Sequence, residues 1–169
     1  MRGRGTGAGI ARALPLDVTT TVDDSVSAVL REDHRRLEGQ LASLIRDFAP
    51  GCDPRDLRDA WGSFELGVLA HMHAEEVHLF RAFRHVHPKE TQELLDEHER
   101  LRAHLTELSI ALDLHCLDGH EIRDLAARLG AHAVKEERLL YPWAADRLGH
   151  VVRSELLRAQ ADALGPRPP

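Results

Sequence analysis

The feature that most constrains this chain is a pattern of histidines and acidic residues that occurs twice with the same internal offsets. In each copy, an acidic residue and a histidine precede leucines at helical spacing, and a later segment places a histidine four residues before two consecutive glutamates. The copies consist of Asp33, His34, His71, Glu75 and Glu76, and of Glu97, His98, His132, Glu136 and Glu137. Two matching sets in register suggest two half-sites that close on one centre, with enough imidazole and carboxylate groups for two metal ions.

The segments that carry these residues show the 3.6-residue periodicity of amphipathic helices. The first helix is expected over about residues 24–48, and the following breaks lie at residues 49–51, 87–88 and 118–119, which contain proline or glycine. Pro142 is expected to bend or end the fourth helix, because its ring clashes with the preceding turn. The predicted fold class is all-α, an up-down-up-down four-helix bundle with a short additional C-terminal helix.

The predicted domain organisation is a disordered leader at residues 1–22, the bundle at residues 23–148, the C-terminal helix at residues 149–164 and a tail at residues 165–169. A net charge of −6 argues against a nucleic-acid partner, because there is no basic surplus to meet phosphates. No apolar run approaches the roughly 20 residues of a membrane span, so no membrane association is expected. The 2 cysteines do not make a disulfide framework, and the expected location is the reducing cytoplasm.

The histidines and glutamates occupy stripe positions that leucines would otherwise fill, so they are expected to point into the core. An isolated buried charge costs several kcal/mol, whereas a bound metal removes the protons and neutralises the charges of its ligands. The i, i+4 spacing also puts an imidazole and a carboxylate one above the other on a helix face. The predicted metal ligands are His34, His71, Glu75, His98, His132 and Glu136.

These residues give the chain a resemblance to the hemerythrin, or HHE cation-binding, family. The resemblance covers about residues 30–143 and includes, besides the two copies of the pattern, Tyr141 and Pro142 at the end of the second copy. It implies a four-helix bundle around a non-haem di-iron centre with an oxo or hydroxo bridge. It also implies that the four histidines are terminal ligands and that Glu75 and Glu136 bridge the metals. Manganese and zinc are the alternative metals.

One departure from the family pattern concerns oxygen carriage. Oxygen-carrying hemerythrins use a fifth histidine through a His-x3-His pair on the third helix, whereas here Leu94 and Arg102 stand four residues on either side of His98. The pattern is closer to that of di-iron proteins linked to the repair of damaged iron centres, although this chain lacks their N-terminal cysteine pair. The missing ligand argues against reversible oxygen carriage and leaves an open position on each metal for a small molecule.

Three residues near the predicted ligands have two interpretations each. Glu76 and Glu137 either accept hydrogen bonds from ligand imidazoles or form surface salt bridges. Tyr141 either hydrogen-bonds near the cluster or packs at the end of its helix.

Three further residues receive a structural interpretation. His78 is interpreted as a polar core neighbour rather than an extra ligand, because Leu139 occupies the matching position of the second copy. Cys52 and Cys116 lie in equivalent turns and are interpreted as unrelated cysteines rather than as a redox pair, because bundle edges are often too far apart for a disulfide.

The leading functional hypothesis is a cytoplasmic non-haem di-iron protein that binds or reduces a small oxidant: dioxygen, hydrogen peroxide or nitric oxide. An enzymatic role, peroxidase-like or catalase-like in oxidative stress or directed at nitric oxide, stays open. The alternative hypothesis is an iron-handling protein or a redox or oxygen sensor whose state is read by a protein partner. A structural zinc site is the third hypothesis.

Overall fold

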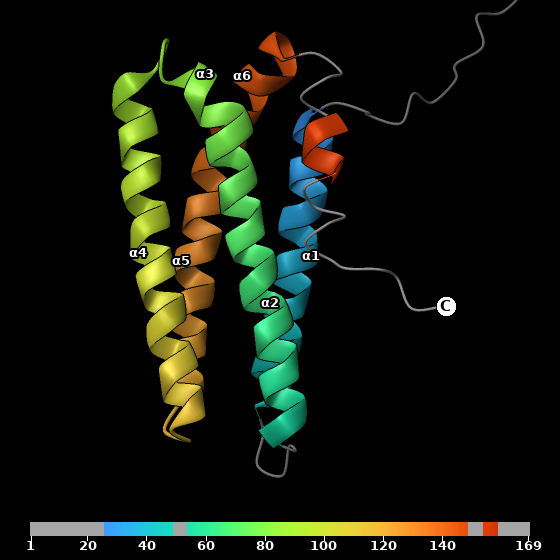
Figure 1. Ribbon diagram of the computed structural model, residues 1–169, viewed down its shortest axis with the longest axis vertical. Helices are drawn as coiled ribbons and strands as arrows, with labels where there is room; N and C mark the ends of the chain where they lie inside the picture. Colours follow the sequence, from blue (N-terminus) through green and yellow to red (C-terminus); the bar gives the residue numbers. More distant parts are fainter. Residues whose placement is uncertain (1–25, 49–53, 149–153, 159–169) are drawn as a thin grey trace, which may run out of the picture.

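The computed structural model describes residues 26–48, 54–148 and 154–158 and consists of helices (Figure 1). The four long helices are α1 (Val26–Asp47), α2 (Pro54–Glu75), α4 (Pro88–Asp113) and α5 (Gly119–Arg138). α2 continues through the π-helical segment η1 (Glu76–Phe80) into α3 (Arg81–Phe83), and α6 (Leu140–Arg147) follows α5. No strand occurs among these residues, so the all-α prediction is confirmed.

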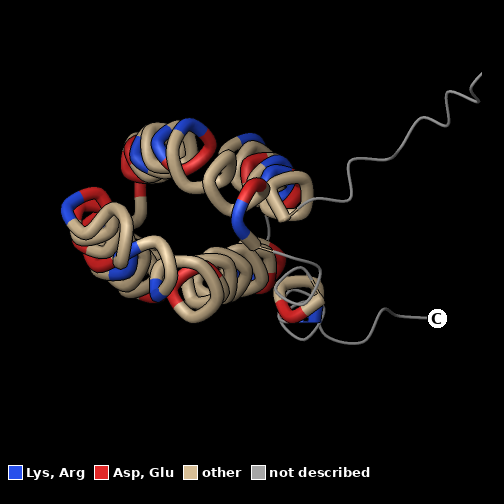
Figure 2. The backbone as a smooth tube through the Cα atoms, turned by 90° about the horizontal axis from the view of Figure 1, so that it is seen from above, with Lys and Arg blue, Asp and Glu red and all other residues tan. Residues whose placement is uncertain are grey.

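Each long helix runs opposite to the one before it, as the colour order in Figure 1 shows. α1 contacts α2 and α5, and α4 contacts the same two helices. These contacts place the four around a common axis in the order α1, α2, α4, α5. Figure 2 gives the view from above, along this axis. This is the up-down-up-down bundle expected from the sequence.

Local sequence signals explain where the second half of the bundle starts and turns. α4 begins with Pro88 in its first turn, where a missing N–H is tolerated. α5 begins with a capping box, in which the Asp118 carboxylate accepts from the backbone N–H groups of His120 and Glu121, and the Glu121 carboxylate accepts from the N–H of Asp118. The loop between them passes through His115, whose φ of 58° is left-handed.

The fourth predicted helix breaks at Leu139, whose φ of −120° is not helical. The break lies three residues before Pro142, and the ring of a proline clashes with the carbonyl group four residues earlier, here that of Arg138. The expected effect of Pro142 is therefore confirmed, and the second part of the helix is α6. The π-helical segment η1 on α2 was not predicted.

Two hydrophobic clusters fill the bundle on either side of a polar layer. One lies toward α3 and α6 and is formed mainly by Leu30, Leu79, Phe83, Leu94, Leu140, Tyr141 and Leu156. The other lies toward the opposite end and is formed mainly by Leu41, Leu44, Trp61, Phe64, Leu105, Leu108, Ile122 and Leu125. The buried histidines and glutamates of the repeated pattern lie between them.

Some predictions concern residues outside the described part of the chain. These are the leader at residues 1–22, the tail at residues 165–169 and Cys52. Of the expected C-terminal helix, only residues 154–158 are described, and they are helical. Within the described ranges, no helix combines the length and the apolar run that crossing a membrane requires.

Candidate metal centre

The six predicted ligands come from all four long helices and meet in the polar layer. They are His34 on α1, His71 and Glu75 on α2, His98 on α4, and His132 and Glu136 on α5. The exposed fraction of these residues does not exceed 7%, and it is 0% for both glutamates. The i, i+4 spacing on α2 and α5 places each imidazole beside the carboxylate of its own helix. All six side chains therefore lie in the core.

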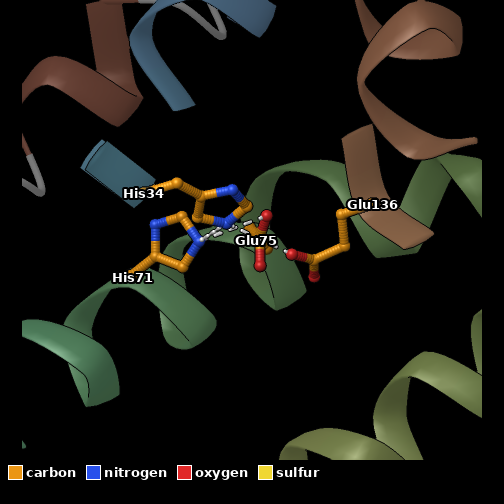
Figure 3. Close-up of side chains that lie close together, drawn as sticks. All are labelled: His34, His71, Glu75 and Glu136. Carbon is orange, nitrogen blue, oxygen red and sulfur yellow. Dashed lines mark hydrogen bonds and ion pairs between the residues drawn. The ribbon is translucent and has the colours of Figure 1, made fainter. Parts of the chain in front are cut away.

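The donors fall into two overlapping sets, and within each set the ligand atoms all lie within 4.8 Å of one another. The sets are His34, His71, Glu75 and Glu136, and Glu75, His98, His132 and Glu136. Figure 3 shows the first set, with two imidazoles facing two carboxylates. Both glutamates belong to both sets, which is the arrangement that two carboxylate-bridged ions would need. The structure thus groups the histidines in pairs, which the sequence alone left open.

The distances within the sets are those of side chains converging on one point. Nε2 of His34 lies 3.0 Å from Nε2 of His71, and Nε2 of His98 lies 2.9 Å from Nε2 of His132. Imidazole nitrogens this close in a hydrophobic interior either share a proton or share a metal ion.

Each glutamate reaches histidines of both sets. Glu136 Oε1 lies 2.9 Å from His132 Nε2, and Glu136 Oε2 lies 3.3 Å from His34 Nε2 without hydrogen-bond geometry. Glu75 Oε1 lies 3.5 Å from His71 Nε2. Oε2 of both glutamates is buried and accepts no hydrogen bond from the described residues. Leaving such an oxygen unsatisfied costs about 1–3 kcal/mol, and a metal ion between the sets would remove that cost.

The outer nitrogen of every predicted histidine ligand contacts a carboxylate from another helix. Two of these carboxylates directly precede a histidine in the sequence. Asp33 Oδ2 lies 2.9 Å from His71 Nδ1, and Glu97 Oε2 lies 2.9 Å from His132 Nδ1. An Nδ1–H that donates to a carboxylate fixes the ring and turns the Nε2 lone pair toward the centre.

The other two carboxylates connect the two halves of the repeat. Glu76 Oε1 lies 2.8 Å from His98 Nδ1 and also accepts from Arg102 Nη2 at 2.7 Å. Glu137 Oε1 lies 3.3 Å from His34 Nδ1. Of the two interpretations of Glu76 and Glu137, the hydrogen bond to a ligand imidazole is therefore the one that the structure supports.

The two half-sites differ in one aromatic residue. Phe80 and Tyr141 occupy matching positions, and their rings lie on His98 and His34 with centroid separations of 5.2 and 5.3 Å. Tyr141 Oη donates to Glu75 Oε1 at 2.8 Å and lies 2.8 Å from His34 Nε2. The hydroxyl group therefore belongs to the cluster, and it makes the first set chemically different from the second.

Tyr141→Phe is expected to lower the free energy of unfolding of the metal-free protein by about 1–3 kcal/mol, because the buried Glu75 carboxylate loses its donor. The ring itself is tolerated, since Phe80 fills the matching position. Urea unfolding of the metal-free variant and wild type measures the difference. Unchanged unfolding would show that the hydroxyl contributes no stabilising hydrogen bond.

Burial and neighbouring groups shift the two shared carboxyl groups in opposite directions. Burial and then the charge of Glu136 raise the pKa of Glu75 well above its ordinary value. Burial acts in the same direction on Glu136, but its close interactions with the imidazoles of His132, His34 and His98 outweigh burial and hold the pKa of Glu136 well below its ordinary value. The metal-free centre therefore holds protons that an arriving metal ion must displace.

Metal loading at pH 7 is expected to release at least one proton per chain. Burial acts to lower the pKa of His132, but hydrogen bonding to Glu136 and its charge raise the value from 6.5 to about 9. The imidazole is thus protonated at pH 7, and the metal affinity should rise with pH up to about 9. The same shift means that protonated His132 stabilises the metal-free protein. This contribution to the free energy of unfolding is fully present below pH 6.5 and is lost as the pH rises through 9.

Calorimetric titration with metal in two buffers of different ionisation enthalpy counts the released protons. Urea unfolding of the metal-free protein at several pH values measures how its stability depends on pH. A metal affinity that does not change with pH would contradict the expectation.

His78 and Cys116 do not belong to the centre. His78 Nδ1 lies 3.2 Å from Glu155 Oε2 in the helical turn at residues 154–158, and neither donor set contains it. Cys116 is exposed, and its equivalent Cys52 lies outside the described residues. The roles of Asp33 and Glu97 were not predicted from the sequence, although each directly precedes a predicted ligand.

The chain matches a known protein family. The sequence profile of the Hemerythrin HHE cation binding domain matches residues 25–162. Neither the curated proteins nor the solved structures compared with the chain give a match. The profile covers most of the chain, and the buried donor sets are what a cation-binding domain requires. The resemblance seen in the sequence is therefore confirmed, and the chain belongs to the hemerythrin HHE cation-binding domain family.

Proposed function

We propose that this protein holds two iron ions and binds or reduces a small oxidant, with hydrogen peroxide as the first candidate and dioxygen and nitric oxide as the others. The observation that carries the proposal is the sharing of Glu75 and Glu136 between two buried donor sets. Imidazole suits several transition metals, whereas the carboxylates that would bridge the ions favour iron or manganese over zinc.

The residues present fit a metal pair. Four Nε2 atoms converge on the shared carboxylates, and the four Nδ1 atoms contact carboxylates outside the centre. This is how proteins usually orient histidine ligands. The two buried oxygens that accept no hydrogen bond lie between the sets and are free to bind metal.

The groups in and around the centre would have different roles in the reaction. Held by the four histidines and the two shared glutamates, a ferrous pair would supply the two electrons that, with two protons, convert one hydrogen peroxide into two water molecules. Tyr141 Oη holds a proton 2.8 Å from Glu75 Oε1, on the side of the first set. The hydrophobic clusters above and below limit the access of bulk water, so that only small or apolar molecules reach the imidazoles.

The environment of His98 supports reaction rather than reversible oxygen carriage. Leu94 packs in the hydrophobic cluster near α6, and Arg102 donates to Glu76 outside the centre. α4 therefore offers no second imidazole at either i±4 position. Each donor set offers two imidazoles and two shared carboxylates, which would leave room on a bound ion for a small molecule.

The test is the metal content of freshly purified protein, followed by rapid mixing of the ferrous protein with hydrogen peroxide. We expect two irons per chain and fast peroxide consumption. His71→Ala should slow consumption at least tenfold, on the order expected for a lost metal ligand. The matched control is His78→Ala, because His78 is a half-buried histidine in the following segment η1, contacts Glu155 and lies outside both donor sets.

Two results would contradict the proposal. Zinc in place of iron would favour a structural site. Equal peroxide consumption by wild type and His71→Ala would show that the reaction does not take place at the metal centre. Slow chemistry combined with a large redox-dependent change in shape or association would favour the sensor hypothesis instead.

A further inference from the structure

A cavity of about 240 Å³ lies inside the bundle between α1, α2 and α5. Three predicted ligands, His34, His71 and His132, form one end of it. Beyond these imidazoles its walls are hydrophobic except for Glu38, which is exposed where the cavity meets solvent. The cavity therefore joins the surface of the protein to both donor sets.

The cavity is elongated along the bundle axis. On α1 its wall runs from His34 to Ile45, and at 1.5 Å per residue this corresponds to roughly 16 Å. On α2 the wall runs from His71 back to Phe64, and on α5 from His132 back to Ala126, each corresponding to roughly 10 Å. All three walls start at a histidine and extend toward the same end of the bundle, so the cavity is a slot with a polar inner end.

Small residues on α5 keep the slot open. Ala126, Gly130 and Ala133 line it at helical spacing, opposite the leucines of α1. A Cβ atom added to Gly130 would meet no other atom within 4 Å. Glycine inside a helix is less favourable than alanine, so Gly130 lowers the stability of α5. A larger side chain at this position would fill the slot.

The volume exceeds what the smallest oxidants need. A water molecule occupies about 30 Å³ in the liquid, and a cavity of about 150 Å³ lined by Leu, Ile and Phe holds benzene and stays dry. Water in the 240 Å³ slot would find polar side chains only at the three histidines and at Glu38, one helical turn from His34. The lining includes no lysine or arginine, so an anionic group along the slot would lack a counter-charge. The chemistry fits an uncharged aliphatic chain.

We propose that this slot binds the unbranched aliphatic chain of an organic hydroperoxide, with its oxygen end against His34, His71 and His132. The inference rests on the proposed function and deepens it, because it names the class of oxidant. The chain lies along α1 between Leu37 and Ile45, and its far end lies near Ala126.

The test uses 1-octanol, an unreactive analogue with the same chain and a terminal oxygen, in titrations of metal-free and iron-loaded protein. Methyl NMR is expected to show saturable one-to-one binding, with shifts at Leu37, Leu41 and Ile45. Gly130→Leu should weaken binding about tenfold or more, because the new side chain occupies the slot. The matched control is Gly62→Leu, which also replaces a helical glycine with open space around its Cβ but lies outside the slot.

A second variant tests the geometry independently of Gly130. Ala126→Leu would shorten the slot at its far end, so it should abolish the binding of 1-octanol and retain that of 1-butanol. Absence of saturable octanol binding to wild type, or equal binding to all variants, would overturn the inference.

The same samples separate this inference from the proposed function. Octanol binding without any reaction of the iron-loaded protein with hydrogen peroxide, dioxygen or nitric oxide would remove the proposed function and leave the chain-binding slot. Peroxide consumption without octanol binding would support the proposed function and remove the chain-binding slot.

Discussion

Glu75→Ala is expected to reduce the metal content from two ions per chain to one or fewer. Its carboxylate belongs to both donor sets, so its loss removes a donor from each ion at the same time. The variant also removes the carboxylate that accepts the hydrogen bond from Tyr141 Oη in the core. Glu136→Ala should behave in the same way, because Glu136 also belongs to both sets. Elemental analysis after loading with excess ferrous iron and desalting measures the result.

The matched control for both variants is Glu99→Ala, an exposed glutamate next to His98 on α4. It should retain two ions. Circular dichroism of the metal-free proteins separates loss of ligands from loss of the fold. Full loading of both Glu75→Ala and Glu136→Ala would remove the bridging assignment.

Asp33→Asn is expected to weaken binding of the ion in the first set by about 10- to 100-fold, the usual effect of losing a carboxylate behind a histidine ligand. Asp33 Oδ2 accepts from His71 Nδ1 at 2.9 Å, and both side chains are 5% exposed. Asparagine keeps the shape but removes the charge that makes the imidazole a stronger donor to metal. It also loses the ion pair of Asp33 with Arg36.

Competition with a chelator measures the affinity of each variant. Glu32→Gln is the control, since Glu32 precedes Asp33 but is exposed and pairs with Arg35. Equal affinities of wild type and Asp33→Asn would show that the outer carboxylates only stabilise the fold.

The sequence was sufficient to predict the bundle and to select the six converging side chains. Leucines at helical spacing identify the buried face of each helix, and His34, His71, His98 and His132 interrupt that face at matching offsets. Because periodicity determines which side of a helix faces the core, it also determines that the interruptions meet there.

Other parts of the site depend on how neighbouring helices are placed. Glu76 is one residue away from the ligand stripe, and only the distance between η1 and α4 shows that it reaches His98. The π-helical segment contains no proline or glycine from which it could have been predicted. The slot likewise depends on the placement of three helices. The alanines and the glycine on α5 line a cavity only because α1 and α2 lie opposite them, and the sequence alone does not show this arrangement.

The first donor set also has a consequence for the lifetime of the protein. It joins α1, the first helix of the bundle, to α5, the last of the four long helices. An ion bound there would act as a cross-link that closes a loop of about 100 residues, and a permanent cross-link of that span stabilises a folded chain by roughly 4–5 kcal/mol. Under metal starvation the seam between these two helices would open more often to proteases. The cellular amount of the protein would then follow the supply of its metal even at a constant rate of synthesis.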